Sequence, residues 1–284
     1  MLFRFVVPAL MYVYHQYRGL EPVSFPAYYL HVYLGFGPKP ENWAFPAWPD
    51  FNFLQMWFVE HLVIYALIYA AWRAWRGRLA AVAPAPEGPI APRRAHAALA
   101  GYTVALIVIM ALLEVAGFSS DHWIGLLGFI QMEPFHFPQY CSLFVFGMIA
   151  YRRDWLRRLP APTGYVWLGI GVAATLIRYG HNIFWHVPVV LQLPLHCLLC
   201  TALCAGLLTL FRERFDRATP FTRALAANTY AVYIIHYPIV VAVQFAIDPV
   251  ALPPSLAALT VAVIAIPVSF AASHYGLRRL PYAR

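Results

Sequence analysis

Long apolar stretches alternate with shorter polar segments along the whole chain, and this alternation predicts its secondary structure. A helix needs about 20 apolar residues to cross a bilayer, and most of the stretches approach that length. They lie at residues 2–18, 51–72, 95–117, 138–151, 161–177, 188–211, 226–247 and 254–276. The pattern predicts an all-α, polytopic transmembrane helical bundle of about eight spans.

Basic residues fall almost entirely in every second connection between these runs, counted from a cytoplasmic start. Only Arg18, Lys39 and Arg178 depart from the rule. Such a bias marks the cytoplasmic side of multi-span proteins, so we expect both termini to be cytoplasmic. The inner segments hold Arg4, Arg73, Arg76, Arg78, Arg93, Arg94, Arg152, Arg153, Arg157, Arg158, Arg212, Arg214, Arg217, Arg223, Arg278, Arg279 and Arg284.

The composition agrees with a membrane protein. Hydrophobic residues make up 62% of the chain and charged residues 11%, whereas soluble domains contain roughly 25% charged residues. Eight helices nearly use up the 284 residues, which predicts a single integral membrane domain over residues 1–284. The net charge of +8 comes from inner loops that face anionic headgroups, so we expect the lipid bilayer, and no nucleic acid, as a partner.

Three connections differ in character. Residues 19–50 are rich in proline and aromatic residues, which favours a lid or re-entrant piece on the outer face. Residues 76–94 contain proline, alanine and arginine, as expected of a flexible cytoplasmic loop. The apolar middle of 118–137 suggests an element that dips into the outer leaflet. The run that follows, 138–151, is short for a span, at roughly 21 Å of helix.

Ionisable side chains near the middle of predicted spans are candidate functional groups, because charge is costly there. Glu60 lies in the second run, and His236 lies in the seventh with Tyr233 on the same helical face. A structural alternative remains for each. Glu60 would form a hydrogen bond between helices, and His236 would donate to a backbone carbonyl.

A second group of ionisable residues lies near the outer ends of spans: Glu114, Glu133, His136, Arg178, His181 and His186. Arg178 breaks the charge rule, so it either pairs with Glu114 or Glu133 or holds an anionic or hydroxyl-rich substrate. Cys197, Cys200 and Cys204, beside His196, are interpreted as small residues for close helix packing rather than as a metal site.

Four segments resemble the membrane-bound acyltransferase-3 family, which includes sugar O-acetyltransferases and a succinyltransferase of periplasmic glucans. In order they are LFRFVVPAL, NFLQMWFVEHLVIYALIYAAWR, PQYCSLFVFGMIAYRRDWL and NTYAVYIIHYPIVV. The resemblance implies a multi-pass protein of the bacterial inner membrane that modifies cell-envelope polysaccharide. It also implies transfer of an acetyl or succinyl group from cytoplasmic acyl-CoA to a hydroxyl of an extracytoplasmic glycan or lipid-linked sugar.

The family pattern is incomplete in this sequence. Family members usually have about ten spans, and the first carries an arginine followed some ten residues later by a catalytic histidine. The family's Arg-x-x-Arg element would fall on Met1 to Arg4, where only Arg4 matches. The sequence therefore looks like a member that lacks its first two helices, through a misplaced start, a fragment, a degenerate paralogue or a separately encoded N-terminal half.

The resemblance assigns expected roles to particular residues. A histidine suits the base of O-acylation because it titrates near working pH, and the resemblance places that base on the missing helix. His236 and Glu60 would be the catalytic candidates in this chain, as supporting groups that orient the acceptor pocket. Arg4, Arg152 and Arg153 would bind the phosphates of the acyl-CoA donor, since the guanidinium fork matches phosphate. Substrate binding would fall to Arg178, His136, Glu133 and Tyr233, with no permanently bound cofactor and no metal. A small transporter or flippase and an inactive membrane fragment remain the alternatives.

Overall fold

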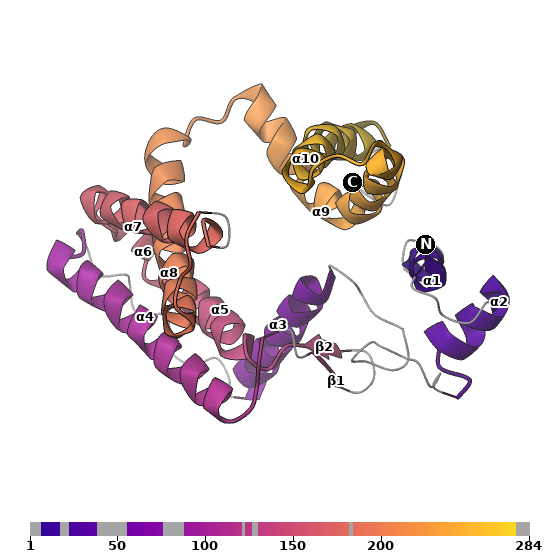
Figure 1. Cartoon of the computed structure of the whole chain (residues 1–284). Helices are drawn as coiled ribbons and strands as arrows, with labels where there is room; N and C mark the ends of the chain where they lie inside the picture. The colour runs from indigo at the N-terminus through magenta and orange to yellow at the C-terminus, as the bar shows by residue number, and fades with distance from the viewer. Residues whose placement is uncertain are drawn as a thin grey trace. The chain divides into compact units, whose positions relative to one another are not determined.

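The structure, a computed structural model, describes residues 7–17, 23–38, 56–75, 88–120, 123–126, 130–181 and 184–276 (Figure 1). The chain divides into two compact units. The terminal unit comprises Met1–Tyr28, Leu54–Met56 and Arg217–Arg284, and the central unit comprises Tyr29–Phe53 and Trp57–Asp216. Whether the two act as the single domain expected from the sequence stays a prediction.

A helix lies in each of the eight predicted apolar runs. These helices are α1 (Val7–Tyr17), α3 (Trp57–Trp75), α4 (Pro92–Val115), α5 (Phe137–Arg152), α7 (Ala161–Tyr179), α8 (Val189–Arg214), α9 (Pro220–Ile247) and α10 (Pro254–Ala271). Shorter elements are α2 (Phe25–Ala27), η2 (Tyr28–Tyr33), β1 (Ile124–Leu126), β2 (Ile130–Met132), α6 (Trp155–Arg158), η4 (Asp248–Val250) and η5 (Ala272–Gly276). The predicted all-α architecture is confirmed.

Within the described residues, four helical segments are long and apolar enough to cross a membrane: Pro92–Val115, Val189–Arg214, Pro220–Val250 and Pro254–Gly276. The remaining helices are shorter or less apolar. For example, α3 contains Glu60, His61 and Arg73, and α5 has only 16 residues. The membrane-spanning class is therefore confirmed, whereas the number of spans and the side on which the termini lie stay predictions.

Proline and threonine explain where several helices begin. Pro92, Pro138, Pro220 and Pro254 each occupy the first or second position of a helix. There the missing N–H costs nothing, because the first turn has no intrahelical partner for it. At α9, Thr219 also forms a capping box with Thr222, in which each side chain bonds the other residue's backbone N–H.

Glycine allows α7 and α8 to pack closely in the central unit. A Cβ atom added to Gly206 of α8 would lie 2.5 Å from the Cα of Leu168 in α7. One added to Gly171 of α7 would lie 2.8 Å from the side chain of Leu203. Small residues at such contacts let antiparallel helices approach each other in lipid, where van der Waals packing drives association.

The connection between α4 and α5 contains a short antiparallel hairpin, in which Ile124 pairs with Met132 and Leu126 with Ile130 (Figure 1). The sequence analysis expected an apolar element in this segment but not its strands. Residues 25–33, in the first of the predicted outer connections, are helical. Most of the 76–94 loop lies outside the described residues, and α4 begins at Pro92, inside that loop's expected range.

Candidate functional site

A tight turn between β2 and α5 places two ionisable side chains together. The N–H groups of His136 and Phe137 both donate to the carbonyl oxygen of Glu133, at 3.2 and 3.1 Å. Pro134 occupies the position of the turn that favours proline. Phe135 is buried in a core with Leu106, Met110 and Cys197 of α4 and α8, so the turn is anchored in the helix bundle.

Glu133 and His136 form a close pair within this turn. An oxygen of the Glu133 carboxylate (Oε2) lies 2.8 Å from Nδ1 of His136. Glu133 is only 6% exposed, and the His136 side chain is 17% exposed. A buried carboxylate is stable in such surroundings only when charged or hydrogen-bonding partners compensate for its lost hydration, and His136 supplies one.

Helix α8 adds a second histidine to this pair. The rings of His136 and His196 have centroids 5.1 Å apart. Nε2 of His196 lies 3.0 Å from Oε1 of Gln139, to which it donates, and Gln139 is buried in the first turn of α5. We name Glu133, His136, Gln139 and His196 the outer polar cluster, after the side of the membrane on which the charge bias predicts this end of α5 to lie.

Aromatic side chains of α3, of α5 and of the residue before the hairpin border this cluster. Tyr140 of α5 stacks on the His136 ring at 6.1 Å and lies 5.2 Å from Trp57. Trp57 in turn contacts Trp123, next to the hairpin, at 5.5 Å. His61 is 3% exposed and packs against Trp57 and Tyr140. Both carboxylate oxygens of its neighbour Glu60 are buried, which is consistent with either role considered for Glu60.

Hydroxyl groups extend the polar contacts down α5. The Tyr102 hydroxyl of α4 lies 2.8 Å from the Ser142 hydroxyl. Ser142 donates in turn to the backbone carbonyl of Gln139 at 3.0 Å. These bonds fix the position of α5 against α4, one turn below the outer polar cluster.

The opposite end of α5 carries the arginines expected to bind the donor. Arg152 donates to the Tyr69 hydroxyl of α3, and its guanidinium lies 5.8 Å from the centre of that ring. Arg153 is exposed, and among the described residues its guanidinium has no hydrogen-bond partner. Arg4 lies outside the described residues.

Two other arginines of the predicted inner segments have structural partners. Arg158 donates to the carbonyl of Gly88 at 2.7 Å, and the N–H of Ile90 donates back to the carbonyl of Arg158 at 2.9 Å. Arg212 donates to the carbonyl of Leu156. These bonds join the loop before α4, the short α6 and the end of α8 at one end of the central unit.

Arg178 lies in the last turn of α7. In the described part of the chain it forms no ion pair with Glu114 or Glu133. The salt-bridge alternative is therefore not observed, and the substrate-binding alternative remains a prediction.

His236 and Tyr233 lie in α9 of the terminal unit, and Glu60 lies in the central unit. Nδ1 of His236 is 2.7 Å from the carbonyl oxygen of Tyr233, and the two rings are 5.8 Å apart. This is the backbone hydrogen bond of the structural alternative. It occupies one ring nitrogen only, so the catalytic role expected for His236 stays a prediction.

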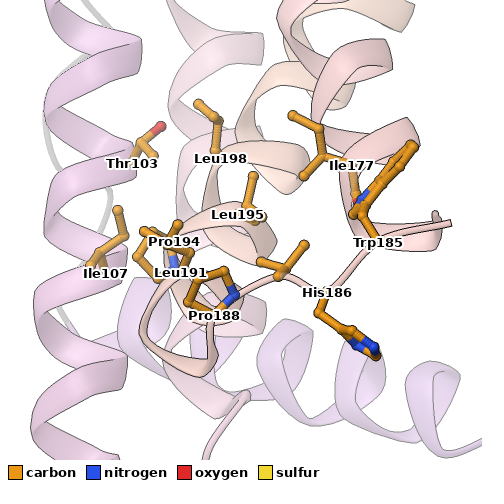
Figure 2. A pocket seen from close by; sticks show the side chains of 11 residues that line it. Thr103, Ile107, Ile177, Trp185, His186, Pro188, Leu191, Pro194, Leu195 and Leu198 are labelled. Atoms are coloured by element: carbon orange, nitrogen blue, oxygen red, sulfur yellow. The ribbon is translucent and has the colours of Figure 1, made fainter. Parts of the chain in front are cut away.

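An apolar groove of about 610 Å³ opens in the central unit. Figure 2 shows Thr103 and Ile107 of α4 on one side, Leu191, Leu195 and Leu198 of α8 in the middle, and Ile177 and Trp185 on the other side. Its apolar lining suits a hydrocarbon chain better than a sugar. His186 and Pro188 lie at the end where α8 begins.

Of the cysteines of α8, Cys197 belongs to the packing of the helices, whereas Cys204 is exposed. Cys197 is fully buried, and its thiol lies 3.7 Å from the sulfur of Met110. Among the described residues, no three His, Cys, Asp or Glu side chains are placed to hold a metal ion.

The structure thus brings together two predicted substrate residues, Glu133 and His136, and adds Gln139 and His196. Sequence reasoning missed Gln139 altogether and considered His196 only beside the cysteines. A signal was present, since His136 and Gln139 are three residues apart across a helix start and share a face. His196, which comes from α8, reaches these residues through the packing of the helices. That packing could not be read from the sequence pattern.

A comparison with protein families identifies the chain. A family model described as an acyltransferase domain, that of the acyltransferase-3 family, matches residues 1–274. No curated protein and no solved structure matches the chain. The family match confirms the resemblance seen in the sequence and favours an enzyme over a transporter. With its apolar, membrane-spanning helices, the chain belongs to the acyltransferase-3 family and is a membrane acyltransferase that transfers groups other than aminoacyl groups.

Proposed function

We propose that this enzyme moves an acyl group of the acetyl or succinyl type from cytoplasmic acyl-CoA to a hydroxyl of an extracytoplasmic glycan or lipid-linked sugar. The observation that carries the proposal is the arrangement of α5. This one helix has a buried Glu–His pair at its start and two arginines, Arg152 and Arg153, at its end. A donor site and an acceptor site would therefore lie at opposite ends of a single element.

The inner end of α5 suits the phosphates of coenzyme A. Arg153 is exposed, and Arg152 is held against Tyr69, so the two offer neighbouring guanidinium groups. Arginine pairs with phosphate through two parallel N–H bonds, which gives both affinity and orientation. We expect Arg153 to contribute more than Arg152 to the affinity for the phosphates. The Arg153 side chain has no hydrogen-bond partner among the described residues, so no existing bond must break when it binds a phosphate.

The outer end suits a hydroxyl-rich acceptor. His136 and His196 offer nitrogen atoms, Gln139 offers an amide, and Trp57 and Tyr140 offer flat aromatic surfaces beside them. Convergent polar groups at the edge of an aromatic wall are typical of small-molecule sites. Arg178, the single arginine on the predicted outer side of the central unit's described helices, would bind an acidic sugar or a lipid phosphate.

The length of α5 brings the two ends close enough for transfer. Sixteen residues correspond to about 24 Å of helix, which is less than the roughly 30 Å of a bilayer core. The extended arm of an acyl-CoA would run along this helix, so that the thioester reaches the outer polar cluster while the phosphates stay at Arg152 and Arg153. For a lipid-linked acceptor, the groove of Figure 2 would receive the hydrocarbon chain.

The donor half of this proposal is tested by Arg153→Ala in purified protein reconstituted in nanodiscs. With radiolabelled acetyl-CoA or succinyl-CoA and a glycan acceptor, we expect the KM for acyl-CoA to rise roughly 10- to 150-fold, as for the loss of one charge-assisted hydrogen-bonded contact of about 1.5–3 kcal/mol. The kcat should change little.

The matched control is Arg214→Ala, which removes another exposed arginine, in the last turn of α8. Its KM should equal that of the wild-type enzyme. Equal KM values for the Arg153→Ala variant and the wild type would remove Arg153 from the donor site. An absence of any transfer from acyl-CoA in the wild type would refute the proposed reaction itself.

A further inference from the structure

The apolar groove of Figure 2 lies between helices that belong in the membrane. It is bordered by α4 and α8, and both helices are long and apolar enough to cross a bilayer. Its lining on α8 runs from Leu191 to Leu198, which corresponds to about 10 Å of helix. Because lipid surrounds such helices, hydrocarbon is the material available to fill the groove, and burying it there is favourable.

The groove also has a direction. Leu198 lies at the end nearer the middle of α8, whereas His186 lies at the other end, before α8 begins (Figure 2). The charge bias places the start of α8 on the predicted outer side. A lipid of the outer leaflet has the same orientation, with its chain toward the membrane centre and its head group at the surface. The groove therefore fits a lipid that enters from the outer leaflet.

The turn between α7 and α8 fixes the outer end of the groove. Nε1 of Trp185 donates to the carbonyl oxygen of Ile177 at 2.9 Å. The Trp185 ring packs directly on Gly180, where a Cβ atom would collide with it. The N–H of Val187 donates to Nδ1 of His181 at 2.8 Å. These contacts join the end of α7 to the residues that precede α8.

Two basic side chains lie in this turn. Arg178 directly follows Ile177 and is partly exposed, and it forms no ion pair in the described part of the chain. His186 directly follows Trp185 and is exposed, with its ring 5.9 Å from that of His181. A guanidinium binds phosphate through two parallel N–H bonds, and an imidazole N–H can donate another. A phosphate is therefore the head group that this turn suits.

The groove adjoins the outer polar cluster. Leu195 lines the groove, and the next residue of α8, His196, belongs to the cluster. Successive residues of a helix point about 100° apart, so the two sites lie on neighbouring faces of α8 at the same level. On α4, Ile107 lines the groove and also packs against the core that contains Phe135 of the cluster's turn. A sugar joined to a lipid in the groove would therefore lie beside the cluster.

From these observations we infer that the acceptor is a sugar joined through phosphate to a single-chain lipid. The hydrocarbon chain lies in the groove, the phosphate binds Arg178 and His186, and the sugar extends to the outer polar cluster. One groove accommodates one chain, which favours a single-chain lipid over a two-chain phospholipid. This inference rests on the proposed function and selects the lipid-linked sugar over the free glycan. Holding the chain would also orient the acceptor hydroxyl for transfer.

The groove is tested by lipid binding to purified protein in detergent micelles, without acyl-CoA. We expect native mass spectrometry to show binding of geranylgeranyl phosphate, a single-chain lipid phosphate. Leu191→Trp, which places an indole in the groove, should raise the Kd roughly 10-fold or more, since expulsion of two methylene groups alone has that effect. The matched control is Val190→Trp, which adds the same ring at an exposed neighbour that does not line the groove. Its Kd should equal that of the wild type.

The head-group contacts are tested by Arg178→Gln and His186→Gln at the outer end of the groove. Arg178→Gln should raise the Kd for geranylgeranyl phosphate roughly 10-fold or more, as for the loss of a charge-assisted hydrogen bond, and His186→Gln should raise it by less. Neither variant should change the Kd for geranylgeraniol, which has the same chain and no charge. These two variants also decide the question if Leu191→Trp does not fold, as judged by thermal unfolding.

An absence of binding to geranylgeranyl phosphate would overturn the inference, and so would equal Kd values for folded Leu191→Trp and Val190→Trp. Equally tight binding of phosphatidylglycerol, with the same response to Leu191→Trp, would assign the groove to ordinary phospholipid instead. In the nanodisc assay the wild type should have a lower KM for a lipid-linked sugar than for the same free sugar, and equal KM values would also contradict the inference. Binding without transfer to either acceptor would refute the proposed function, and the acceptor role with it, while the lipid site would stand.

Discussion

At the scale of single residues, the sequence identified ionisable groups but not their partners. Glu133 and His136 were expected at a substrate site because charge near a membrane is rarely accidental. Their contact was within reach of prediction, since three residues across a proline-containing turn bring side chains together. His196 was not, because its position opposite His136 depends on how α8 packs against α5.

The two catalytic candidates derived from the sequence, His236 and Glu60, make a separate prediction. His236→Ala or Glu60→Ala should lower acyl transfer without loss of membrane insertion, because both groups would orient the acceptor pocket. Transfer is measured in the nanodisc assay, and insertion by extraction of the membrane fraction. If both variants transfer at the wild-type rate, neither residue belongs to the site and the structural role of each is favoured.

At the scale of elements, hydropathy located the helices well because the bilayer requires long apolar segments with satisfied backbone groups. Each of the eight runs contains a helix, with ends shifted by a few residues. The β1–β2 hairpin was not predicted, because its apolar residues are equally compatible with an element embedded in the membrane. Three-residue strands also carry too little alternation to be recognised.

Close packing of α7 against α8 makes a prediction about stability. Gly206→Leu should destabilise the protein by roughly 1–3 kcal/mol, as expected for overpacking, because even a Cβ atom there would meet the backbone of Leu168. Gly169→Leu on α7 is the matched control, since a Cβ at Gly169 meets no atom within 4 Å. Thermal unfolding in detergent measures both. Equal midpoints for the two variants would contradict the close contact.

At the scale of the whole molecule, the arginine pattern predicts the membrane topology. The structure shows that some of these arginines also form hydrogen bonds within the protein. Arg158 and Arg212 bond to backbone carbonyls, whereas Arg153 remains exposed. Sequence alone does not separate these roles, because orientation, packing and phosphate binding all favour the same residue type at the same end of a helix.

Topology is tested with single cysteines in a background whose four native cysteines are replaced by alanine. We expect a cysteine at Pro89 to react with a membrane-impermeant thiol reagent only from the cytoplasmic side, and one at Phe36 only from the outer side. This follows from the charge bias of the connections. Labelling of both positions from the same side would overturn the eight-span arrangement.

Helix α5 would couple its two ends mechanically, because it is continuous from one to the other. Residues 139–152 contain no proline, so no proline interrupts the backbone hydrogen bonds of the helix there, and a tilt of the whole helix that seats a ligand at one end would displace the other end as well. If donor and acceptor bind at the two ends as proposed, their occupancies would then be thermodynamically linked, and the linkage would be reciprocal. If the donor favours the same tilt of the helix as the acceptor does, each substrate would increase the affinity of the enzyme for the other.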